Sequence, residues 1–393
     1  MIVFSSRLPA APPSNAITRA VDALRARGVA FLDLTETNPT LVGLPYAGDS
    51  LAALAGPNGV RYQPESLGLK SARAAIAREC SKPGTVVDPE RVVLTSSTSE
   101  AYALLFKVLC DAGDEVLAPE PSYPLFESLT RLEAVTHKPY RLDYHGVWSM
   151  DRESLLGAAT SRTRAVLVVS PNNPTGSMVR AADRAWLADL CAERGLAIIS
   201  DEVFGDYPLR PAGDASSFAG ETRALTFVLG GLSKSAGLPQ VKLGWMIATG
   251  PDHLVASALA RLDVICDTYL SVSTPVQLAA PDLLARGRVI RAAIQRRIAR
   301  NLTALEGLVR PDSPVTVLAP EGGWSVVLRV PATTSEEALV LRLLEEANVL
   351  VHPGYFFDFA SEAFLISSLL PEPGVFDDAI RRLLSVVPGG HRP

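Results

Sequence analysis

Short apolar runs alternate with helical patterns between about residue 90 and residue 250. Six runs have the length of strands, and several are apolar at nearly every position: residues 92–95, 115–118, 165–170, 196–200, 225–229 and 245–248. Strands that are buried on both faces of a mostly parallel sheet have this pattern, because helices cover both faces of such a sheet. The pattern therefore predicts an α/β core around a mostly parallel mixed sheet.

The order of elements changes after this core. A helical, arginine-rich stretch follows, and then a tail that reads as strand, helix, strand, strand and helix, at residues 324–330, 336–347, 349–352, 364–369 and 376–386. We expect a large α/β domain over residues 46–275, a connecting helix over residues 276–309 and a small α+β domain over residues 310–393. Residues 1–45 are expected to form an N-terminal arm, proline-rich at residues 9–13, and part of the small domain.

Composition narrows the class of protein. The chain has 393 residues, 48% of them hydrophobic, so it can bury a large core. Its net charge of -5 and its scattered basic residues argue against nucleic acid as a partner. No apolar run approaches 18 residues, and the start lacks the pattern of a secretion signal. The cysteines show no metal-ligand spacing, so a cytoplasmic enzyme with reduced thiols is expected.

Candidate chemistry gathers where the predicted strands end, which is where ligands bind open parallel sheets. Ser97-Thr98-Ser99-Glu100 follows the first run, with apolar residues at 101, 104, 105, 108 and 109, so a helix starts near Ser97. Its unpaired N–H groups and hydroxyls would suit a phosphate. Ser97-x-x-Glu100 also fits a simple capping box, and the sequence leaves both readings open.

Two further strand ends carry amides and carboxylates. Residues 171–176 read Pro-Asn-Asn-Pro-Thr-Gly, a rigid turn that either presents amide side chains or is ordinary turn chemistry. Asp201-Glu202 ends a strand too apolar to be exposed, and a buried carboxylate needs a partner. That partner is either a cation of an ion pair or a cationic ring nitrogen.

Lys234 follows the fifth run, among small and apolar residues. A P-loop is excluded because Val228 and Ser233 stand where that motif needs glycine, and the spacing of a nucleophile elbow also fails. A lysine whose pKa is lowered by burial can instead form an imine with a carbonyl cofactor.

Together these segments resemble the class I/II aminotransferases of PLP fold type I, the aspartate-aminotransferase-like group. The resemblance rests on the order and spacing of motifs over about residues 33–384: Tyr62-x-Pro64-x-x-x-Gly68, Asn173-Pro174-Thr175-Gly176, Asp201-Glu202-Val203-Phe204 and Ser233-Lys234-Ser235-Ala236-Gly237-Leu238-Pro239. It implies pyridoxal 5′-phosphate (PLP) as cofactor, a homodimer, and ping-pong transfer of an amino group from an amino acid to a 2-oxo acid.

The resemblance also implies roles at the ring of the cofactor. Lys234 would be the Schiff-base lysine and the proton carrier. Asp201 would bind the pyridine nitrogen and keep it protonated. Asn173 would hydrogen-bond the 3′-oxygen, and Tyr123 would stack on the ring, although a plain core aromatic is the other reading of Tyr123.

At the phosphate end, Ser97, Thr98 and Ser99 would bind at the helix start. Lys242 occupies the place of a phosphate-binding arginine. Tyr62 would reach the phosphate of the neighbouring subunit.

Three departures from the family pattern bear on function. Phe204 replaces a tyrosine that donates to the 3′-oxygen, and Lys242 offers the phosphate a point charge in place of a planar fork. In the final strand, where the family places an arginine that clamps the substrate α-carboxylate, residues 364–370 contain no basic side chain. Either amides such as Asn38 and Asn173 bind the carboxylate, or the substrate lacks one there. A PLP-dependent lyase or decarboxylase is therefore the alternative.

Overall fold

A computed structural model describes the chain except residues 1–3, 9–13, 212, 214 and 388–393, so the predicted proline-rich arm at residues 9–13 lies outside the described residues. Its centre is an eight-stranded sheet in the order β2-β9-β8-β7-β6-β3-β4-β5. The strands are β2 (Val92–Thr95), β3 (Glu115–Glu120), β4 (Thr136–Tyr144), β5 (Trp148–Met150), β6 (Thr163–Val169), β7 (Ala197–Asp201), β8 (Thr226–Gly231) and β9 (Gly244–Thr249).

The five strands from β8 to β4 run parallel to one another. β9 is antiparallel to both of its neighbours, and β5 is antiparallel to β4. The predicted mostly parallel mixed sheet is confirmed, and each of the six predicted strands is present within two residues at either end. β4 and β5 were not predicted.

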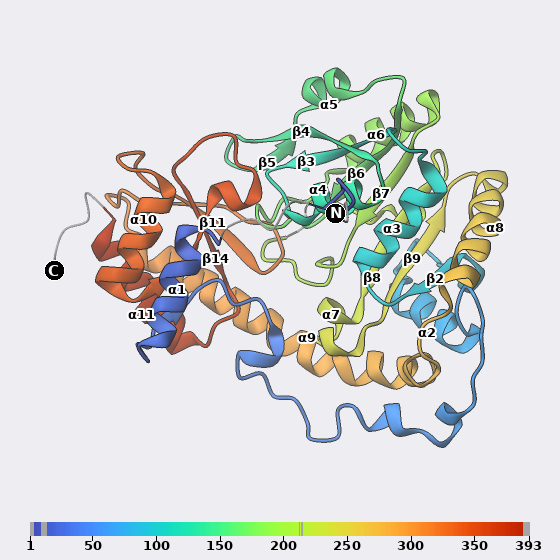
Figure 1. The fold of residues 1–393 in the computed structure, drawn as a ribbon, viewed down its shortest axis with the longest axis horizontal. Helices are drawn as coiled ribbons and strands as arrows, with labels where there is room; N and C mark the ends of the chain where they lie inside the picture. Colours follow the sequence, from blue (N-terminus) through green and yellow to red (C-terminus); the bar gives the residue numbers. More distant parts are fainter. Residues whose placement is uncertain (1–3, 9–13, 212, 214, 388–393) are drawn as a thin grey trace.

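Helices cover both faces of this sheet (Figure 1). Alternate residues of β6 point into two separate cores, with Val166 and Val168 in one and Ala165 and Leu167 in the other. The first core includes residues of α2 (Lys70–Cys80), α5 (Arg152–Ala158) and α6 (Ala181–Arg194). The second includes residues of α3 (Thr98–Leu109), α4 (Leu125–Leu132) and α8 (Asp252–Tyr269). Burial on both faces explains why residues 165–169 of β6 are all apolar.

A third core holds the remaining elements together. Its antiparallel sheet has the order β10-β11-β14-β13, and β1 pairs with β12 beside it. The bounds are β1 (Leu32–Asp33), β10 (Thr316–Leu318), β11 (Ser325–Arg329), β12 (Val349–Leu350), β13 (His352–Pro353), β14 (Phe364–Ser368), α1 (Ala16–Ala26), α10 (Glu336–Arg342) and α11 (Pro373–Val386). The strand predicted at residues 349–352 is thus two short strands in two sheets. The helix predicted to Ala347 is α-helical only to Arg342, and a π-helical turn follows.

One long helix joins these two parts of the molecule. α9 (Thr274–Leu308) has 35 residues, close to the helix predicted over residues 276–309. Its first half contributes Leu283 to a core of the large sheet, and its second half contributes Ile294 and Leu302 to the third core. In Figure 1 it runs along the base of the molecule from one part to the other. Among the described residues, no helix combines the length and apolarity needed to cross a membrane.

Candidate active site

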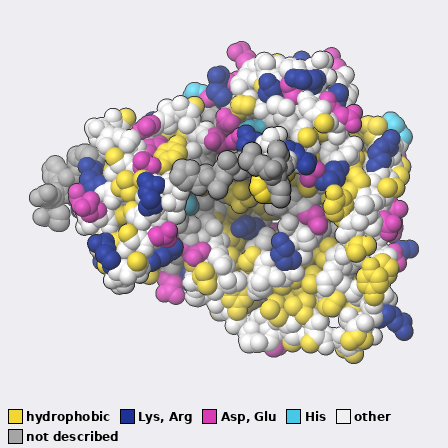
Figure 2. Space-filling view, in the orientation of Figure 1, with side chains coloured by type: hydrophobic (Ala, Val, Ile, Leu, Met, Phe, Trp, Pro, Cys, Tyr) yellow, Lys and Arg dark blue, Asp and Glu magenta, His cyan; other side chains and the backbone are white. Residues whose placement is uncertain are grey.

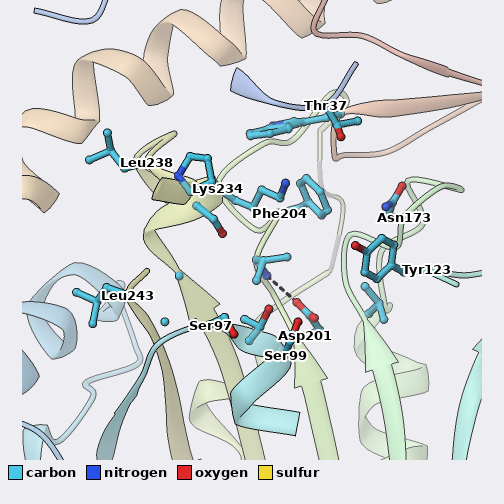
Figure 3. Close-up of a pocket in the computed structure, with 18 of the residues that line it drawn as sticks. Thr37, Ser97, Ser99, Tyr123, Asn173, Asp201, Phe204, Lys234, Leu238 and Leu243 are labelled. Atoms are coloured by element: carbon cyan, nitrogen blue, oxygen red, sulfur yellow. Dashed lines mark hydrogen bonds between the residues drawn. The ribbon is translucent and has the colours of Figure 1, made fainter. Parts of the chain in front are cut away.

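A cavity of about 310 Å³ opens at the carboxyl ends of the parallel strands, a size in the range of small-ligand sites. Most of the residues proposed from the sequence line it: Ser97, Thr98, Ser99, Tyr123, Asn173, Asp201, Phe204, Lys234 and Lys242. Figure 3 shows their side chains converging from β7, from the start of α3 and from the segment after β8. The sheet topology therefore brings together residues that lie up to 145 positions apart, from Ser97 to Lys242.

The start of α3 is capped by a side chain and also lines the cavity. Ser97 is the N-cap, and its hydroxyl accepts a hydrogen bond from the Glu100 N–H at 3.1 Å. The Glu100 carboxylate accepts from the N–H of Ser96, the residue before the cap, so the helix start is a shifted variant of the capping box. Ser97, Thr98 and Ser99 also line the cavity, where the positive end of the helix dipole favours an anion.

The two asparagines of the turn after β6 make different contacts. Asn172 is buried, accepts from the Ser122 hydroxyl at 2.8 Å and donates to the Thr175 hydroxyl at 2.8 Å. These bonds fix the turn. Asn173 instead lies in the cavity, where its side-chain oxygen accepts from the Ser325 hydroxyl at 3.3 Å.

Asp201 ends β7 as a buried carboxylate at the floor of the cavity. Tyr102 donates its hydroxyl to Asp201 Oδ2 at 2.7 Å, and the Val203 N–H donates to Oδ1 at 3.1 Å. Burial raises the pKa of Asp201, while these two hydrogen bonds and the charge of Lys234 act in the opposite direction. A cationic ring nitrogen in the cavity would stabilise the ionised form further.

Lys234 lies on the short helix α7 (Leu232–Ser235). Its Nζ is 4.7 Å from the centre of the Trp324 ring and 5.4 Å from that of Phe204. Burial lowers the pKa of Lys234 to about 8, against the opposing effect of the Asp201 carboxylate. Tyr207 donates its hydroxyl to the Lys234 carbonyl at 2.5 Å and so fixes the backbone that carries the amine.

Two of the proposed residues do not line the cavity. Tyr62 is 67% exposed on the surface of the single chain. Asn38 caps its own turn, because its Oδ1 accepts from the N–H and the hydroxyl of Thr40, and the neighbouring Thr37 lines the cavity instead. Tyr123 does line the cavity and remains 43% exposed, so it is not a core aromatic.

Sequence reasoning missed Tyr102, Tyr207 and Trp324. Tyr102 lies 99 residues before Asp201, and Trp324 lies 90 residues after Lys234, so no local motif connects them with the groups they contact. The one available signal for Tyr102 was its position in the first turns of α3, the helix already assigned to the site.

The chemistry of these side chains fits PLP. A buried amine of lowered pKa can form an imine with the aldehyde of PLP, and a buried carboxylate can pair with its ring nitrogen. Hydroxyls at a helix start match the phosphate. Lys234, Asp201 and the start of α3 would therefore hold the three ends of the cofactor.

Comparison with known proteins agrees with this fit. The profile of the family described as aminotransferase class I and II matches residues 43–372. The chain is 29% identical over 381 residues to an alanine aminotransferase of Mycobacterium tuberculosis, covering 92% of this chain and 86% of the relative. It is 27% identical to a glutamate-pyruvate aminotransferase of Haemophilus influenzae, covering 81% of each chain.

A solved structure shares the fold. An alanine aminotransferase from Pyrococcus furiosus superposes with a TM-score of 0.87 at 24% identity, covering 98% of this chain and 99% of the other. The family match favours amino-group transfer over the elimination or decarboxylation that the missing arginine had left open. The chain belongs to the class I and II aminotransferases, PLP-dependent enzymes of fold type I.

Proposed function

We propose that Lys234 is the catalytic residue of a ping-pong transfer of an amino group from an amino acid to a 2-oxo acid. The observation that carries this proposal is a buried amine and a buried carboxylate, Lys234 and Asp201, in one cavity. When bound, PLP supplies an aldehyde that takes up the amino group and a ring that withdraws electrons from the substrate.

Lys234 is suited to move a proton near neutral pH. With a pKa of about 8, the lysine populates both its neutral and its charged form near neutral pH. Nζ can therefore accept a proton from the substrate carbon and return it. The Trp324 and Phe204 rings beside Nζ exclude water from this exchange. Tyr207 keeps the lysine in position through its bond to the Lys234 carbonyl.

The other side chains hold the cofactor in this proposal. Asp201 binds the ring nitrogen, and Tyr102 orients the carboxylate. Asn173 binds the 3′-oxygen, and Tyr123 covers the ring.

The phosphate lies at the start of α3 in the same proposal. Ser97, Thr98 and Ser99 donate to it, and Lys242 adds a positive charge. Lys242 follows the 3-10 turn Pro239–Val241, adopts the left-handed conformation itself, with φ 59°, and lines the cavity together with Gly244.

We infer a homodimer from an exposed apolar patch around Tyr62. Val60 is 93% exposed and Tyr62 67%, and the end of α8 adds Tyr269 at 60% and Leu270 at 68%. The Gln63 N–H donates to the hydroxyl of Thr274, the first residue of α9, so the segment of Tyr62 lies beside the chain that links α8 to α9. Figure 2 shows further hydrophobic side chains over α9, below the central hollow. A second copy that covers this patch would bring Tyr62 to the phosphate of its neighbour.

We also infer a cytoplasmic location. Cys80, Cys110, Cys191 and Cys266 all carry free thiols, and a reducing compartment preserves such thiols.

The test is the visible absorption of purified protein loaded with PLP, before and after each of a panel of L-amino acids. A competent donor should convert the bound cofactor to pyridoxamine phosphate, identified by chromatography after denaturation, and a 2-oxo acid should reverse the change. Lys234→Ala should abolish both directions, whereas Lys138→Ala, a surface lysine, should retain them. Release of an alkene, ammonia or CO₂ without pyridoxamine phosphate would contradict the proposal.

A further inference from the structure

The short helix α7, which carries Lys234, is held by side chains from other elements. It has only four residues, so it closes few hydrogen bonds of its own, and the carbonyls at its end need other donors. Three side chains supply them: Tyr207 donates to the Lys234 carbonyl at 2.5 Å, Arg291 to that of Ser235 at 2.7 Å, and Tyr46 to that of Gly237 at 2.6 Å. Arg291 is the charged member of this set.

Arg291 comes from the long helix α9, which lies beside α7 (Figure 1). One turn before Arg291, Gly287 lets the two backbones approach, since a Cβ on Gly287 would overlap the Cβ of Ala236. A Cβ on Gly237 would come within 2.7 Å of Ile290 Cγ2. This face of α9 therefore fits closely against residues 235–237, and Arg291 adds a hydrogen bond to the contact.

Two carboxylates hold the guanidinium of Arg291 in place. The Arg291 side chain is only 19% exposed, and its Nη2 lies 2.9 Å from Oε1 of Glu79 on α2. Its Nε, which donates to the Ser235 carbonyl, also lies 3.3 Å from Oδ2 of Asp206. Burial alone would raise the pKa of Glu79, but Arg288 and Arg291 together lower it, so Glu79 is ionised at neutral pH. The buried charge of Arg291 is thus paired and aimed at one backbone carbonyl.

We propose that Arg291 is a positioning residue for Lys234. Its hydrogen bond fixes the peptide that follows the lysine, and so fixes the direction in which Nζ enters the cavity. Arg291 does not line the cavity itself, so it acts on the reaction only through the backbone. A displacement of about 1 Å can slow a reaction roughly a hundredfold, which makes this peptide a sensitive point. The inference rests on the proposed function of Lys234 and adds a second residue to it.

Two variants of equal length separate the hydrogen bond from the charge. In Arg291→Gln, the amide Nε2 takes the place that Nε has in arginine and can still donate to the Ser235 carbonyl, whereas Arg291→Met has a carbon there. Both variants remove the charge. Glu79 keeps Arg288 as a partner, and Asp206, whose pKa burial raises, can take up a proton, so both variants can fold. Adding Asp206→Asn to both removes the unpaired carboxylate if either one unfolds.

The first measurement is the rate at which the apoprotein binds PLP covalently. At saturating PLP, Nζ of Lys234 adds to the aldehyde carbon, and the aldehyde oxygen leaves as water with two protons of the amine. The visible absorption follows this step. We expect Arg291→Met to slow it about tenfold or more, and Arg291→Gln to stay within about threefold of the wild-type protein. Circular dichroism establishes that each variant is folded.

Arg288→Met is the control for the ion cluster. Arg288 pairs with the same carboxylate, at 2.8 Å from Glu79 Oε2, but its side chain is 67% exposed. Its replacement should change the rate by less than about twofold. In amino transfer, Arg291→Met should lower kcat about tenfold or more and change KM by less than about threefold, because the groups that line the cavity are intact.

The comparison of the two Arg291 variants decides the proposal. Equal rates in folded Arg291→Met and Arg291→Gln, whether slow or unchanged, would overturn the positioning role and leave amino transfer intact, because only the hydrogen bond distinguishes the pair. If Arg291→Met alone binds PLP slowly, but no L-amino acid converts the cofactor of the wild-type protein to pyridoxamine phosphate, the positioning role stands and the proposed function fails.

Discussion

At the scale of single residues, burial of the Lys234 amine disfavours its charged form. Its pKa is about 8 in the folded apoprotein and 10.5 in the reference state, because burial disfavours the charged form. Between pH 8 and 10.5 the unfolded chain therefore binds more protons than the folded one, so this group makes stability rise with pH in that window. Below pH 8 the lysine is charged in both the folded and the unfolded state, so the folded state is destabilised by the full cost of burying this charge.

Replacing this lysine should stabilise the apoprotein. We expect Lys234→Met to raise the free energy of unfolding by about 3 kcal/mol at pH 7, with the difference shrinking toward zero by pH 10.5. Urea unfolding of both apoproteins at pH 7, 8.5 and 10 measures it. Lys242→Met changes an exposed lysine and serves as the control that should show no such trend. If the difference in the free energy of unfolding did not change with pH, packing and not charge would be its cause.

Phe204 leads to a prediction for the loaded enzyme. Its ring is 5.4 Å from Lys234 Nζ and packs on Trp324 with centroids 5.4 Å apart. Phe204→Tyr adds a hydroxyl that can donate to the ionised 3′-oxygen, which favours the deprotonated cofactor–lysine linkage. The pH at which the visible absorption of the PLP-loaded protein titrates should fall by about one unit, the equivalent of one charged hydrogen bond. An unchanged midpoint in a folded, loaded variant would place the new hydroxyl out of reach of the cofactor.

At the scale of elements, the start of α3 combines a structural cap with a proposed phosphate site, and Ser99, unlike Ser97, has a role only in the second. Ser97→Ala removes the N-cap and should cost the apoprotein about 1 kcal/mol of stability. Ser99 is exposed, so Ser99→Ala should change apoprotein stability by less than about 0.5 kcal/mol but weaken PLP binding roughly tenfold. Thermal unfolding and PLP titration measure both. Equal losses of stability in the two variants would contradict the division.

The sequence predicted strands best where nearly all residues of the strand are buried. β2, β8 and residues 165–169 of β6 consist mostly of apolar residues because both faces are buried, and the positions of the three strands were found within two residues. β4 contains Lys138 and Arg141 and is only partly buried, since it lies next to the edge strand β5, so its pattern did not stand out. Residues 349–352 read as one strand, but the chain changes sheets within them, which depends on tertiary contacts alone.

Site residues could be predicted where they lie at the end of a strand that the sequence itself identifies. Asp201 ends β7 and Lys234 follows the end of β8, and these strands are neighbours in the sheet. The sheet topology therefore brings the two residues together. Tyr102 and Trp324 could not be found, because their contacts with Asp201 and Lys234 exist only after the two parts of the chain pack. The family resemblance pointed to Asn173, but the turn residues alone did not show that Asn172 has a structural role, because that role depends on Ser122, a residue 50 positions away.

At the scale of the whole molecule, the proposed dimer would bring Tyr62 to the site of its neighbour. Tyr62 lies outside the cavity of its own chain, on an exposed apolar patch. Tyr62→Ala should therefore weaken PLP binding by about tenfold or more in a dimer of identical chains, through loss of one hydrogen bond to a charged phosphate. The affinity is measured by titrating PLP into the apoprotein.

Hybrid dimers test which chain supplies the tyrosine. When Tyr62→Ala and Lys234→Ala chains carrying different affinity tags are co-expressed and the mixed dimer is purified, one site combines an intact Lys234 with an intact Tyr62 from the other chain. We expect this site to bind PLP with wild-type affinity and to carry out amino transfer, at about half the activity of the wild-type dimer because the second site lacks both groups. A tyrosine acting within its own chain would leave no intact site in the hybrid, so the weak PLP binding of Tyr62→Ala would persist and the subunit-crossing role would be wrong.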